Sequence, residues 1–252
     1  MESGKESLDK DQLKKYADDL AGLYQSEKQK SKDLEEANKQ NLQYAKDLNR
    51  AFLDLKTSHR KLQESYLDTI YRLAIATEFK DEGTGNHIQR MSKYCALLAE
   101  KLGLDSRTVE NIRLTAPMHD IGKIGIPDAI LLKKGKLSNK EFEIIKTHTI
   151  IGAKILDDSN SEILQMAQQI AISHHEKWNG KGYPFQLAGE DIPLVGRIVA
   201  LADVFDAITS ERPYKKAYSL KVALDIIRKE RGHHFDPRIV DVFFDNLDKF
   251  RK

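Results

Sequence analysis

Leucines recur with a seven-residue period through the first quarter of the chain. Leucine fills most of one row of this repeat, at Leu13, Leu20, Leu34, Leu48, Leu55 and Leu62, while Glu27 and Asn41 occupy the two other positions. A second row, from Ala17 to Tyr66, is mixed and partly polar. A seven-residue apolar repeat keeps one seam of a helix facing a partner helix. The pattern predicts a coiled-coil helical leader over residues 1–65, paired in a parallel homodimer; a solvated single helix is the alternative.

Beyond about residue 66, turns interrupt the helical pattern. All six prolines of the chain lie in this part. Apolar periodicity and capping residues predict helices over 66–79 and 87–102, and a third from Ser106 to about 118. Four further helices are predicted by their starts: one after the capping box of Ser138 and Glu141, one after Ser161, one near Pro193 and one at Asp236-Pro237. No alternating apolar and polar pattern long enough for a β-strand occurs. We therefore expect an all-α domain over residues 66–252, preceded by a long N-terminal helix.

Composition narrows the class of protein. The 252 residues contain 41 Lys and Arg against 39 Asp and Glu, and this near-zero net charge argues against a general DNA- or RNA-binding protein. The only cysteine, Cys95, lies in an apolar run and is expected to be buried. The sequence starts without the apolar stretch of a signal peptide, and no window approaches the roughly 20 apolar residues of a membrane span. We expect a cytoplasmic location, and an upstream sensor domain in a longer chain stays open.

Histidines and aspartates gather at the predicted helix ends of the second part. His119 and Asp120 are adjacent, His174 and His175 are adjacent, and His87 begins a predicted helix. His148 and Asp203 lie in otherwise apolar segments, where an aspartate is costly to bury unless a positive group meets it. Imidazole and carboxylate ligands together suit Fe, Mn, Zn or Ni. Each histidine alone also fits a hydrogen-bonded core residue or a solvated turn, so the prediction rests on the whole set.

The set predicts two metal sites that share one carboxylate. One cation takes His87, His119, Asp120 and Asp203, and the other takes Asp120, His148, His174 and His175. Asp120 is the expected bridge because a carboxylate offers two oxygens. A second pair of adjacent histidines, His233 and His234, precedes a predicted helix start in a turn-like segment and is expected to be structural.

Two segments, HDIGKIGIPD and HHEKWNGKGYP, resemble the HD-GYP family, a branch of the HD superfamily of metal phosphohydrolases. Further segments similar to the family are TGNHIQRMSKY, EFEIIKTHTIIGAKIL, GRIVALADVFDAITSERPYKKA and HHFDPRIVD, so that the resemblance covers about residues 66–250. It implies an HD-type helical bundle whose two or three metal ions are often iron or manganese. It also implies opening of cyclic di-GMP to linear pGpG, sometimes followed by cleavage to GMP; some relatives prefer a mixed cyclic GMP-AMP.

The family's ligand positions fall on the residues of the predicted metal set, namely His87, His119, Asp120, His148, His174, His175 and Asp203. The resemblance also places Lys123 near the scissile phosphate. A Glu-x-x-x-His pair for a third metal is not found ahead of the domain, which favours two divalent metal ions. Relatives often carry a glycine and a basic residue just after the Gly-Tyr-Pro segment, whereas this chain has Gln186 and Ala188 there. This departure leaves affinity and the choice between cyclic di-GMP and cyclic GMP-AMP open.

The expected reaction is attack of a metal-bridging hydroxide on the phosphodiester. Asp120 and Lys123 are the expected catalytic residues, and Lys123, Tyr183 and Arg212 are the expected substrate contacts. Tyr183 fits packing of its loop as well as stacking on a base, and Lys123 also fits a surface turn. Two other functions remain: an HD-type phosphohydrolase of mononucleotides or (p)ppGpp, and a catalytically inert signalling scaffold.

Overall fold

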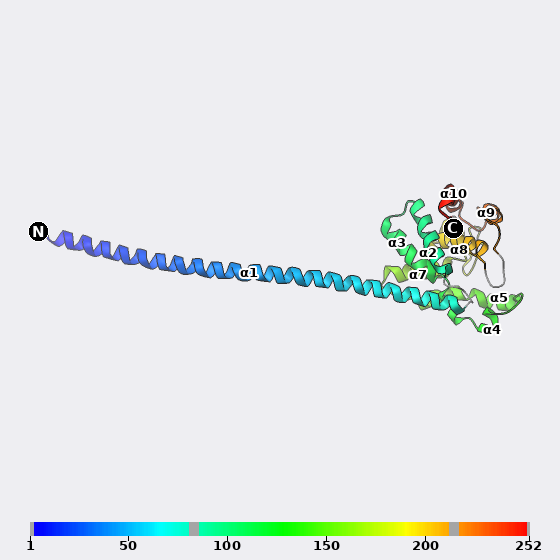
Figure 1. The fold of residues 1–252 in the computed structure, drawn as a ribbon, viewed down its shortest axis with the longest axis horizontal. Coiled ribbons are helices and arrows are strands. Elements are labelled where there is room, and N and C mark those ends of the chain that lie inside the picture. Colours follow the sequence, from blue (N-terminus) through cyan, green and yellow to red (C-terminus); the bar gives the residue numbers. More distant parts are fainter. Residues whose placement is uncertain (1–2, 81–85, 212–216, 251–252) are drawn as a thin grey trace. The chain divides into compact units, whose positions relative to one another are not determined.

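The computed structural model describes residues 3–80, 86–211 and 217–250, and these ranges fold almost entirely into helices (Figure 1). The α-helices are α1 (Ser3–Lys80), α2 (Asn86–Lys101), α3 (Ser106–Thr115), α4 (Asp128–Leu131), α5 (Asn139–Lys146), α6 (His148–Ile155), α7 (Glu162–Ser173), α8 (Leu194–Thr209), α9 (Leu220–Lys229) and α10 (Pro237–Asp245). The 3₁₀ helices are η1 (Ala116–Met118), η2 (Ile121–Gly125), η3 (Gly189–Asp191) and η4 (Leu247–Phe250). Within these ranges β-structure is limited to isolated bridges. The predicted all-α fold with a long N-terminal helix is confirmed.

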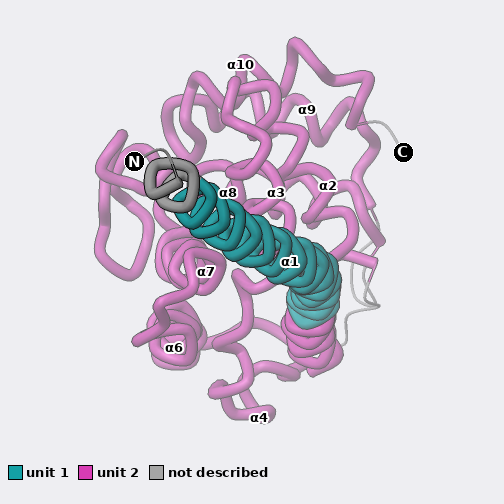
Figure 2. The backbone as a smooth tube through the Cα atoms, turned by 90° about the vertical axis from the view of Figure 1, so that its left-hand side faces the viewer, with its two compact units in different colours: residues 1–64 teal, residues 65–252 magenta. Residues whose placement is uncertain are grey.

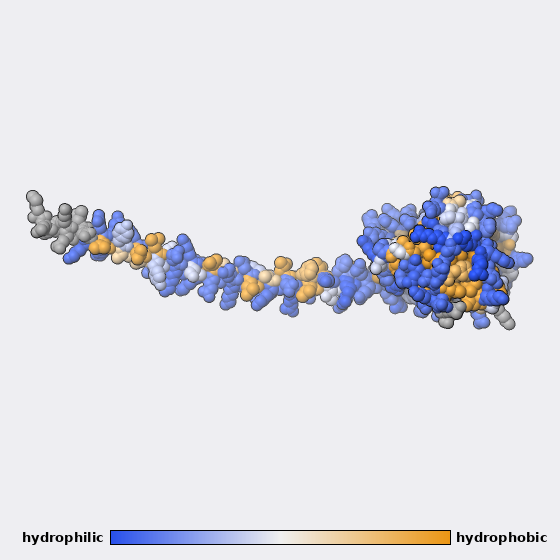
Figure 3. Space-filling view, turned by 90° about the horizontal axis from the view of Figure 1, so that it is seen from above, coloured by the Kyte–Doolittle hydropathy of each residue, from blue (hydrophilic) through white to orange (hydrophobic). Residues whose placement is uncertain are grey.

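The chain divides into two compact units, residues 1–64 and residues 65–252 (Figure 2). In the first unit, the side chains of residues 10–64 are exposed, including Leu13 at 65%, Leu34 at 63% and Leu62 at 69%. Apolar groups recur among charged ones along this helix (Figure 3). No helix within the described ranges combines the length and the apolar character needed to cross a bilayer. The predicted coiled-coil pairing of this unit stays a prediction.

Helix α8 is the centre of the second unit. Most of its apolar residues between Val195 and Ile208 are buried, and it contacts α2, α7, α9 and α10 (Figure 1). Gly196 permits the close crossing with α7, because a Cβ there would lie 2.1 Å from the hydroxyl oxygen of Ser173. Cys95 is fully buried in the same core, as predicted. This packing holds the polar residues of α8 at fixed positions in an apolar setting.

The helix starts test the predicted caps. Ser138 and Glu141 form the predicted capping box ahead of α5, and the carboxylate of Asp236 accepts a hydrogen bond from the backbone N–H of Arg238 at the start of α10. Ser106 was the wrong residue for the cap of α3. The side chain of the preceding residue, Asp105, instead accepts from two backbone N–H groups of the first turn, and α3 ends at Thr115 before continuing as η1.

Candidate metal centre

A short change of helix type brings His119 and Asp120 to the protein interior. The chain leaves α3 through the 3₁₀ turn η1, with Pro117 in its first turn, and His119 follows directly as the capping residue at its C-terminal end. Asp120 then precedes η2 with backbone angles outside the helical range. Because two turns meet here, two adjacent side chains point in different directions within one small space.

The other members of the predicted set come from four further helices. His87 lies in the first turn of α2, His148 begins α6, His174 ends α7 with His175 directly after it, and Asp203 lies within α8. The structure collects these side chains into two groups in which the ligand atoms lie within 4.8 Å of one another: His87, His119 and Asp203, and Asp120, His148, His174 and His175. All seven residues predicted as ligands are thus brought together.

Asp120 lies between the two groups. One carboxylate oxygen, Oδ2, is 3.2 Å from Nε2 of His119 in the first group. The other oxygen, Oδ1, is 3.3 Å from Nε2 of His148 and 3.8 Å from Nε2 of His174 in the second. Asp203 adds a carboxylate oxygen 3.6 Å from Nε2 of His87. Two His/Asp groups that share one carboxylate are consistent with a binuclear metal site.

Hydrogen bonds on the outer side of the rings fix which nitrogen faces this centre. Nδ1 of His119 bonds the carbonyl oxygen of Ala116 at 2.9 Å, and Nδ1 of His148 bonds that of Ile145 at 2.7 Å. Nδ1 of His174 lies 3.1 Å from two carbonyl oxygens of α7. A carbonyl accepts only from a protonated nitrogen, so in the neutral form that binds metal each Nε2 presents its lone pair to the centre.

The inward-facing atoms lack the partners that a protein interior normally supplies. Nε2 of His148 and Nε2 of His174 face each other at 3.4 Å, although both carry lone pairs. Nε2 of His119 and Oδ1 of Asp120 are buried and make no hydrogen bond with the described residues. Buried polar atoms are otherwise almost always satisfied. A cation bound to these atoms would remove both the repulsion and the unsatisfied groups, so the residues present fit a metal pair.

The carboxylates set the protonation of the imidazoles. Burial lowers the pKa of His119, but the charges of Asp120 and Asp203 outweigh burial and raise it to about 9. Burial lowers the pKa of His174 and, together with the neighbouring His174, takes the pKa of His175 well below its usual value. Burial raises the pKa of Asp120, yet Lys123 and His119 hold it well below the usual range. Asp120 is therefore a stable anion at the junction of the two groups.

Lys123 and Tyr183 lie beside the two groups. The ammonium nitrogen of Lys123 is 2.8 Å from Oδ2 of Asp120. The ring of Tyr183 stacks on the ring of His175, with centroids 4.7 Å apart. Its loop is held by Glu176, whose buried carboxylate accepts hydrogen bonds from the backbone N–H groups of Phe185 at 2.7 Å and Leu187 at 3.1 Å. Arg212, the remaining predicted substrate contact, lies outside the described residues.

The pair His233 and His234 does not join the metal groups. Their carbonyl oxygens accept hydrogen bonds from the backbone N–H groups of Asn179 and Trp178, and the ring of His234 stacks on Phe235. They support the segment that follows His175, in agreement with the structural role expected for them.

Sequence reasoning missed Asp206, which orients a ligand. Its buried carboxylate accepts from Nδ1 of His87 at 2.8 Å and from the guanidinium of Arg90. Burial raises the pKa of Asp206, but the hydrogen bonds from Arg90 and His87 outweigh burial and lower it below the usual range. One signal was present in the sequence: Asp206 follows Asp203 by one helical turn in the same apolar helix, and the cost of burying an aspartate applies to both.

Changing Asp206 to asparagine is expected to weaken metal binding about tenfold. Outer partners of ligating histidines typically contribute about 10- to 100-fold in affinity, and asparagine keeps an acceptor oxygen for His87 while losing the charge. Titration of the chelator-treated protein with Mn²⁺ measures the change. Asp236→Asn is the matched control, because it breaks another buried carboxylate–arginine pair, with Arg197 at 2.6 Å. Equal Mn²⁺ affinity in Asp206→Asn and the native protein would contradict the assignment.

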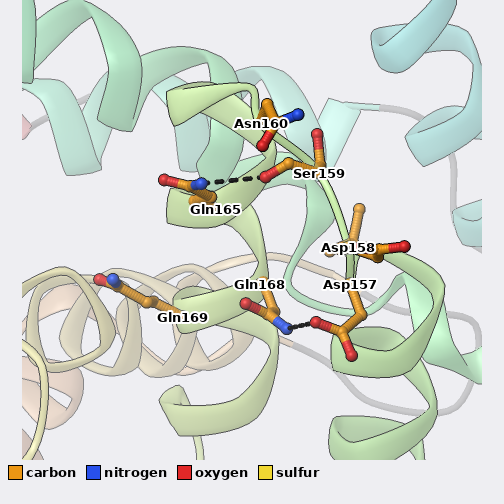
Figure 4. A pocket seen from close by; sticks show the side chains of 8 residues that line it. Asp157, Asp158, Ser159, Asn160, Gln165, Gln168 and Gln169 are labelled. Atoms are coloured by element: carbon orange, nitrogen blue, oxygen red, sulfur yellow. Dashed lines mark hydrogen bonds between the residues drawn. The ribbon is translucent and has the colours of Figure 1, made fainter.

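A separate polar hollow lies where α6 turns into α7 (Figure 4). Two amide side chains of the hollow donate hydrogen bonds within it: Nε2 of Gln168 donates to the carboxylate of Asp157 at 2.8 Å, and Nε2 of Gln165 donates to the backbone carbonyl oxygen of Ser159 at 2.9 Å. None of the residues lining the hollow belongs to the two metal groups. We assign it no part in the chemistry.

The sequence is similar to the HD domain family and to several phosphodiesterases of cyclic dinucleotides. A family model described as "HD domain" matches residues 74–239. The cyclic di-GMP phosphodiesterase response regulator RpfG of Xanthomonas campestris pv. campestris is 47% identical over 74% of this chain and 50% of its own length. The 3'3'-cGAMP-specific phosphodiesterase 2 of Vibrio cholerae is 41% identical over 75% of this chain and 36% of its own length. A cyclic di-GMP phosphodiesterase of Thermotoga maritima is 42% identical over 79% of this chain and 55% of its own length. The chain thus spans about half or less of the length of these relatives.

A solved structure shares the helical fold. The crystal structure of a cyclic GMP-AMP-specific phosphodiesterase of Vibrio cholerae, V-cGAP3, superposes with a TM-score of 0.54 over 72% of this chain and 48% of that one. The two sequences are 23% identical in the superposition, so this likeness concerns the fold.

Proposed function

Since the chain belongs to the HD domain family, we propose that residues 65–252 form a metal-dependent phosphodiesterase that opens cyclic di-GMP to linear pGpG. The observation that carries the proposal is the pair of His/Asp groups joined by Asp120, with the ammonium of Lys123 2.8 Å from that carboxylate. The names of the similar proteins, which are phosphodiesterases of cyclic di-GMP or 3'3'-cGAMP, support the substrate class.

The proposed cofactor is a pair of divalent metal ions, iron or manganese in the first place and zinc or nickel as alternatives. His87, His119 and Asp203 would hold one ion, His148, His174 and His175 the other, and Asp120 would contact both. When bound, such a pair would neutralise the charge of a phosphodiester and would lower the pKa of a metal-bound water toward neutrality. The Nδ1 hydrogen bonds to backbone carbonyls would keep the ligand nitrogens in place through the reaction.

Lys123 is the proposed partner of the scissile phosphate. Its ammonium is anchored by Asp120 and would compensate the negative charge that grows on the phosphate oxygens. Hydrolysis joins a water-derived oxygen to phosphorus and breaks the bond to the 3′ oxygen, which then takes up a proton; Lys123 would supply it. Tyr183 and Arg212 remain proposed contacts of the nucleotide, and the stacking of Tyr183 on His175 puts its ring next to the metal groups.

The two other functions are less well supported. A phosphohydrolase of mononucleotides or (p)ppGpp does not require the Gly182-Tyr183-Pro184 segment, which here packs directly on a predicted ligand, His175. An inert scaffold does not require a full set of donors, and here the whole predicted set converges with its free nitrogens inward.

Metal analysis coupled to product identification tests the proposed function. Protein purified without oxygen is assayed for bound metal and then incubated with cyclic di-GMP, 3'3'-cGAMP, ppGpp and dGTP. We expect two metal ions per chain and conversion of a cyclic dinucleotide to its linear form; the product analysis also decides whether pGpG is cut onward to GMP. A metal-loaded protein that leaves both cyclic dinucleotides intact, or that cleaves only ppGpp or dGTP, would refute the proposal.

We also propose that the leader pairs with a second copy of this chain as a parallel coiled coil. The leucine row is more than half exposed in the single chain, which leaves a long apolar seam without cover. The mass of the full chain in solution is expected to be that of a dimer. Removal of residues 1–60 is expected to give a monomer, and a monomeric full chain would contradict the pairing.

A further inference from the structure

Lys80, the last residue of α1, reaches into the loop that carries the catalytic candidates. Its ammonium nitrogen donates hydrogen bonds to three backbone carbonyl oxygens, those of Lys123 at 3.3 Å and of Ile124 and Ile126 at 2.8 Å each. These partners lie more than 40 positions away in the sequence. A lysine ammonium has three N–H donors, and here three carbonyl oxygens receive them.

The three carbonyls belong to the C-terminal end of η2 and the residues after it. The last carbonyls of a helix have few partners within the helix and carry partial negative charge, so a cation stabilises them. The side chain of Lys80 is only 25% exposed, which strengthens these charge-assisted bonds relative to bonds in water. Lys80, at the end of α1, therefore caps the C-terminal end of η2 from a distant part of the sequence.

Packing against α6 also holds η2. Gly122 presses on α6, where a Cβ would lie 1.8 Å from the carbonyl oxygen of His148 and 2.4 Å from the backbone nitrogen of Gly152. The short helix is thus held both by the start of α6 and by the ammonium of Lys80. Asp120 stands at its N-terminus and Lys123 lies within it.

We propose that Lys80 is a positioning residue, which holds η2 so that Asp120 and Lys123 keep their places at the metal centre. The proposal rests on the proposed function for the reaction that it serves. Lys80 does not touch the metal groups; it acts through the backbone of η2.

The ion pair of Lys80 with Asp128 does not account for this contact. The two charged atoms are 3.4 Å apart, but the side chain of Asp128 is 70% exposed. Exposed ion pairs contribute little to stability. Asp128→Asn therefore provides a matched control that removes the ion pair and leaves the three carbonyl bonds in place.

Replacement of Lys80 by methionine tests the proposal through kcat. A displacement of a catalytic group by about 1 Å can lower the reaction rate by up to about 10²-fold. We expect kcat to fall about 10- to 30-fold with KM changed less than about threefold, because Lys80 orients groups rather than binding substrate. Lys80→Arg should restore part of the rate, because arginine also donates to carbonyls, and Asp128→Asn should keep the native rate.

A double-variant cycle separates positioning from a general loss of stability. The part of the effect that acts through Lys123 disappears when Lys123 is already alanine, so Lys80→Met should cost less in kcat in that background than in the native protein. An equal loss in both backgrounds together with native Mn²⁺ affinity in Lys80→Met would overturn the proposal. Should Lys80→Met fail to fold, Lys80→Gln, which keeps a shorter donor, replaces it in the same cycle.

Mn²⁺ affinity provides a readout that does not depend on the cyclic dinucleotide. Asp120 directly precedes η2, so a shift of η2 in Lys80→Met should also displace Asp120 and weaken Mn²⁺ binding severalfold. Asp128→Asn should leave Mn²⁺ binding unchanged. The kcat measurements are repeated with the small artificial diester bis(p-nitrophenyl) phosphate. If the native protein cuts neither kind of diester, the proposed function fails, and the Mn²⁺ titration alone decides about Lys80. The inference would be overturned if Lys80→Met bound Mn²⁺ with native affinity and, in case the native protein cuts a diester, also cut it at the native rate.

Discussion

Asp120→Asn is expected to lower kcat for cyclic dinucleotide hydrolysis by about 10³-fold or more. Asp120 is the residue whose two carboxylate oxygens face different groups, Oδ2 toward His119 and Oδ1 toward His148 and His174. Asparagine removes the negative charge and turns one of these oxygens into an amide donor, which repels a cation. A loss of about 4 kcal/mol of transition-state stabilisation corresponds to this factor.

The measurement combines kcat with the metal content of the purified variant. We expect less than two metal ions per chain, since one of the groups loses its shared ligand. Asp157→Asn is the control: it makes the same chemical change in the polar hollow, where Asp157 bonds Gln168 and whose lining residues belong to neither metal group. A variant Asp120→Asn with native turnover and two bound ions would show that Asp120 does not join the two sites.

Local signals in the sequence predicted the helices well. The capping box of Ser138 and Glu141 and the start at Asp236-Pro237 are determined by residues within one helical turn, and both are confirmed. The error at α3 has the same local origin, because Asp105 and Ser106 are adjacent residues that both favour the capping position. The choice between them depends on the backbone angles of the preceding loop, which sequence alone does not determine.

The donors of the metal centre were predictable as residue types, but their orientation was not. Imidazoles and carboxylates beside helix ends marked the set, whereas the inward direction of each Nε2 depends on carbonyl groups of the surrounding turns. The residues that act behind the donors are found only in the fold. Asp206 meets His87 across 119 positions of sequence, and Lys80 meets η2 across more than 40. No spacing rule connects such partners, because tertiary packing alone brings them together.

Removal and return of the metal are expected to show that cation binding displaces a proton from His119. In the protein without metal, burial lowers the pKa of this imidazole, but Asp120 and Asp203 raise it to about 9. At pH 7 the ring is then mostly protonated, whereas a ligand nitrogen must be neutral. The lowered pKa values of His174 and His175 leave these two rings neutral at the same pH. Metal binding at pH 7 therefore carries the cost of deprotonating His119.

The sign of the effect on stability is opposite with and without metal. A raised pKa means that protonated His119 stabilises the metal-free fold fully below the usual histidine pKa, and that this stabilisation is lost as pH rises through about 9. The metal-free protein should therefore unfold more easily toward pH 9. Over the same pH range the metal-loaded protein should become more stable relative to the metal-free protein, because the affinity for metal rises as the competing proton leaves His119.

The dissociation constant for Mn²⁺ should fall by about tenfold per pH unit above pH 7, for a total of about 100-fold by pH 9, and then level off. Anaerobic calorimetric titrations in two buffers of different ionisation heat give the protons released per chain on metal binding, about one at pH 7 and close to none at pH 10. His59→Gln is the control, because His59 is exposed in the leader and should leave the release unchanged. A dissociation constant that stays constant between pH 7 and 9, with no proton released, would mean that the two carboxylates do not hold a proton on His119.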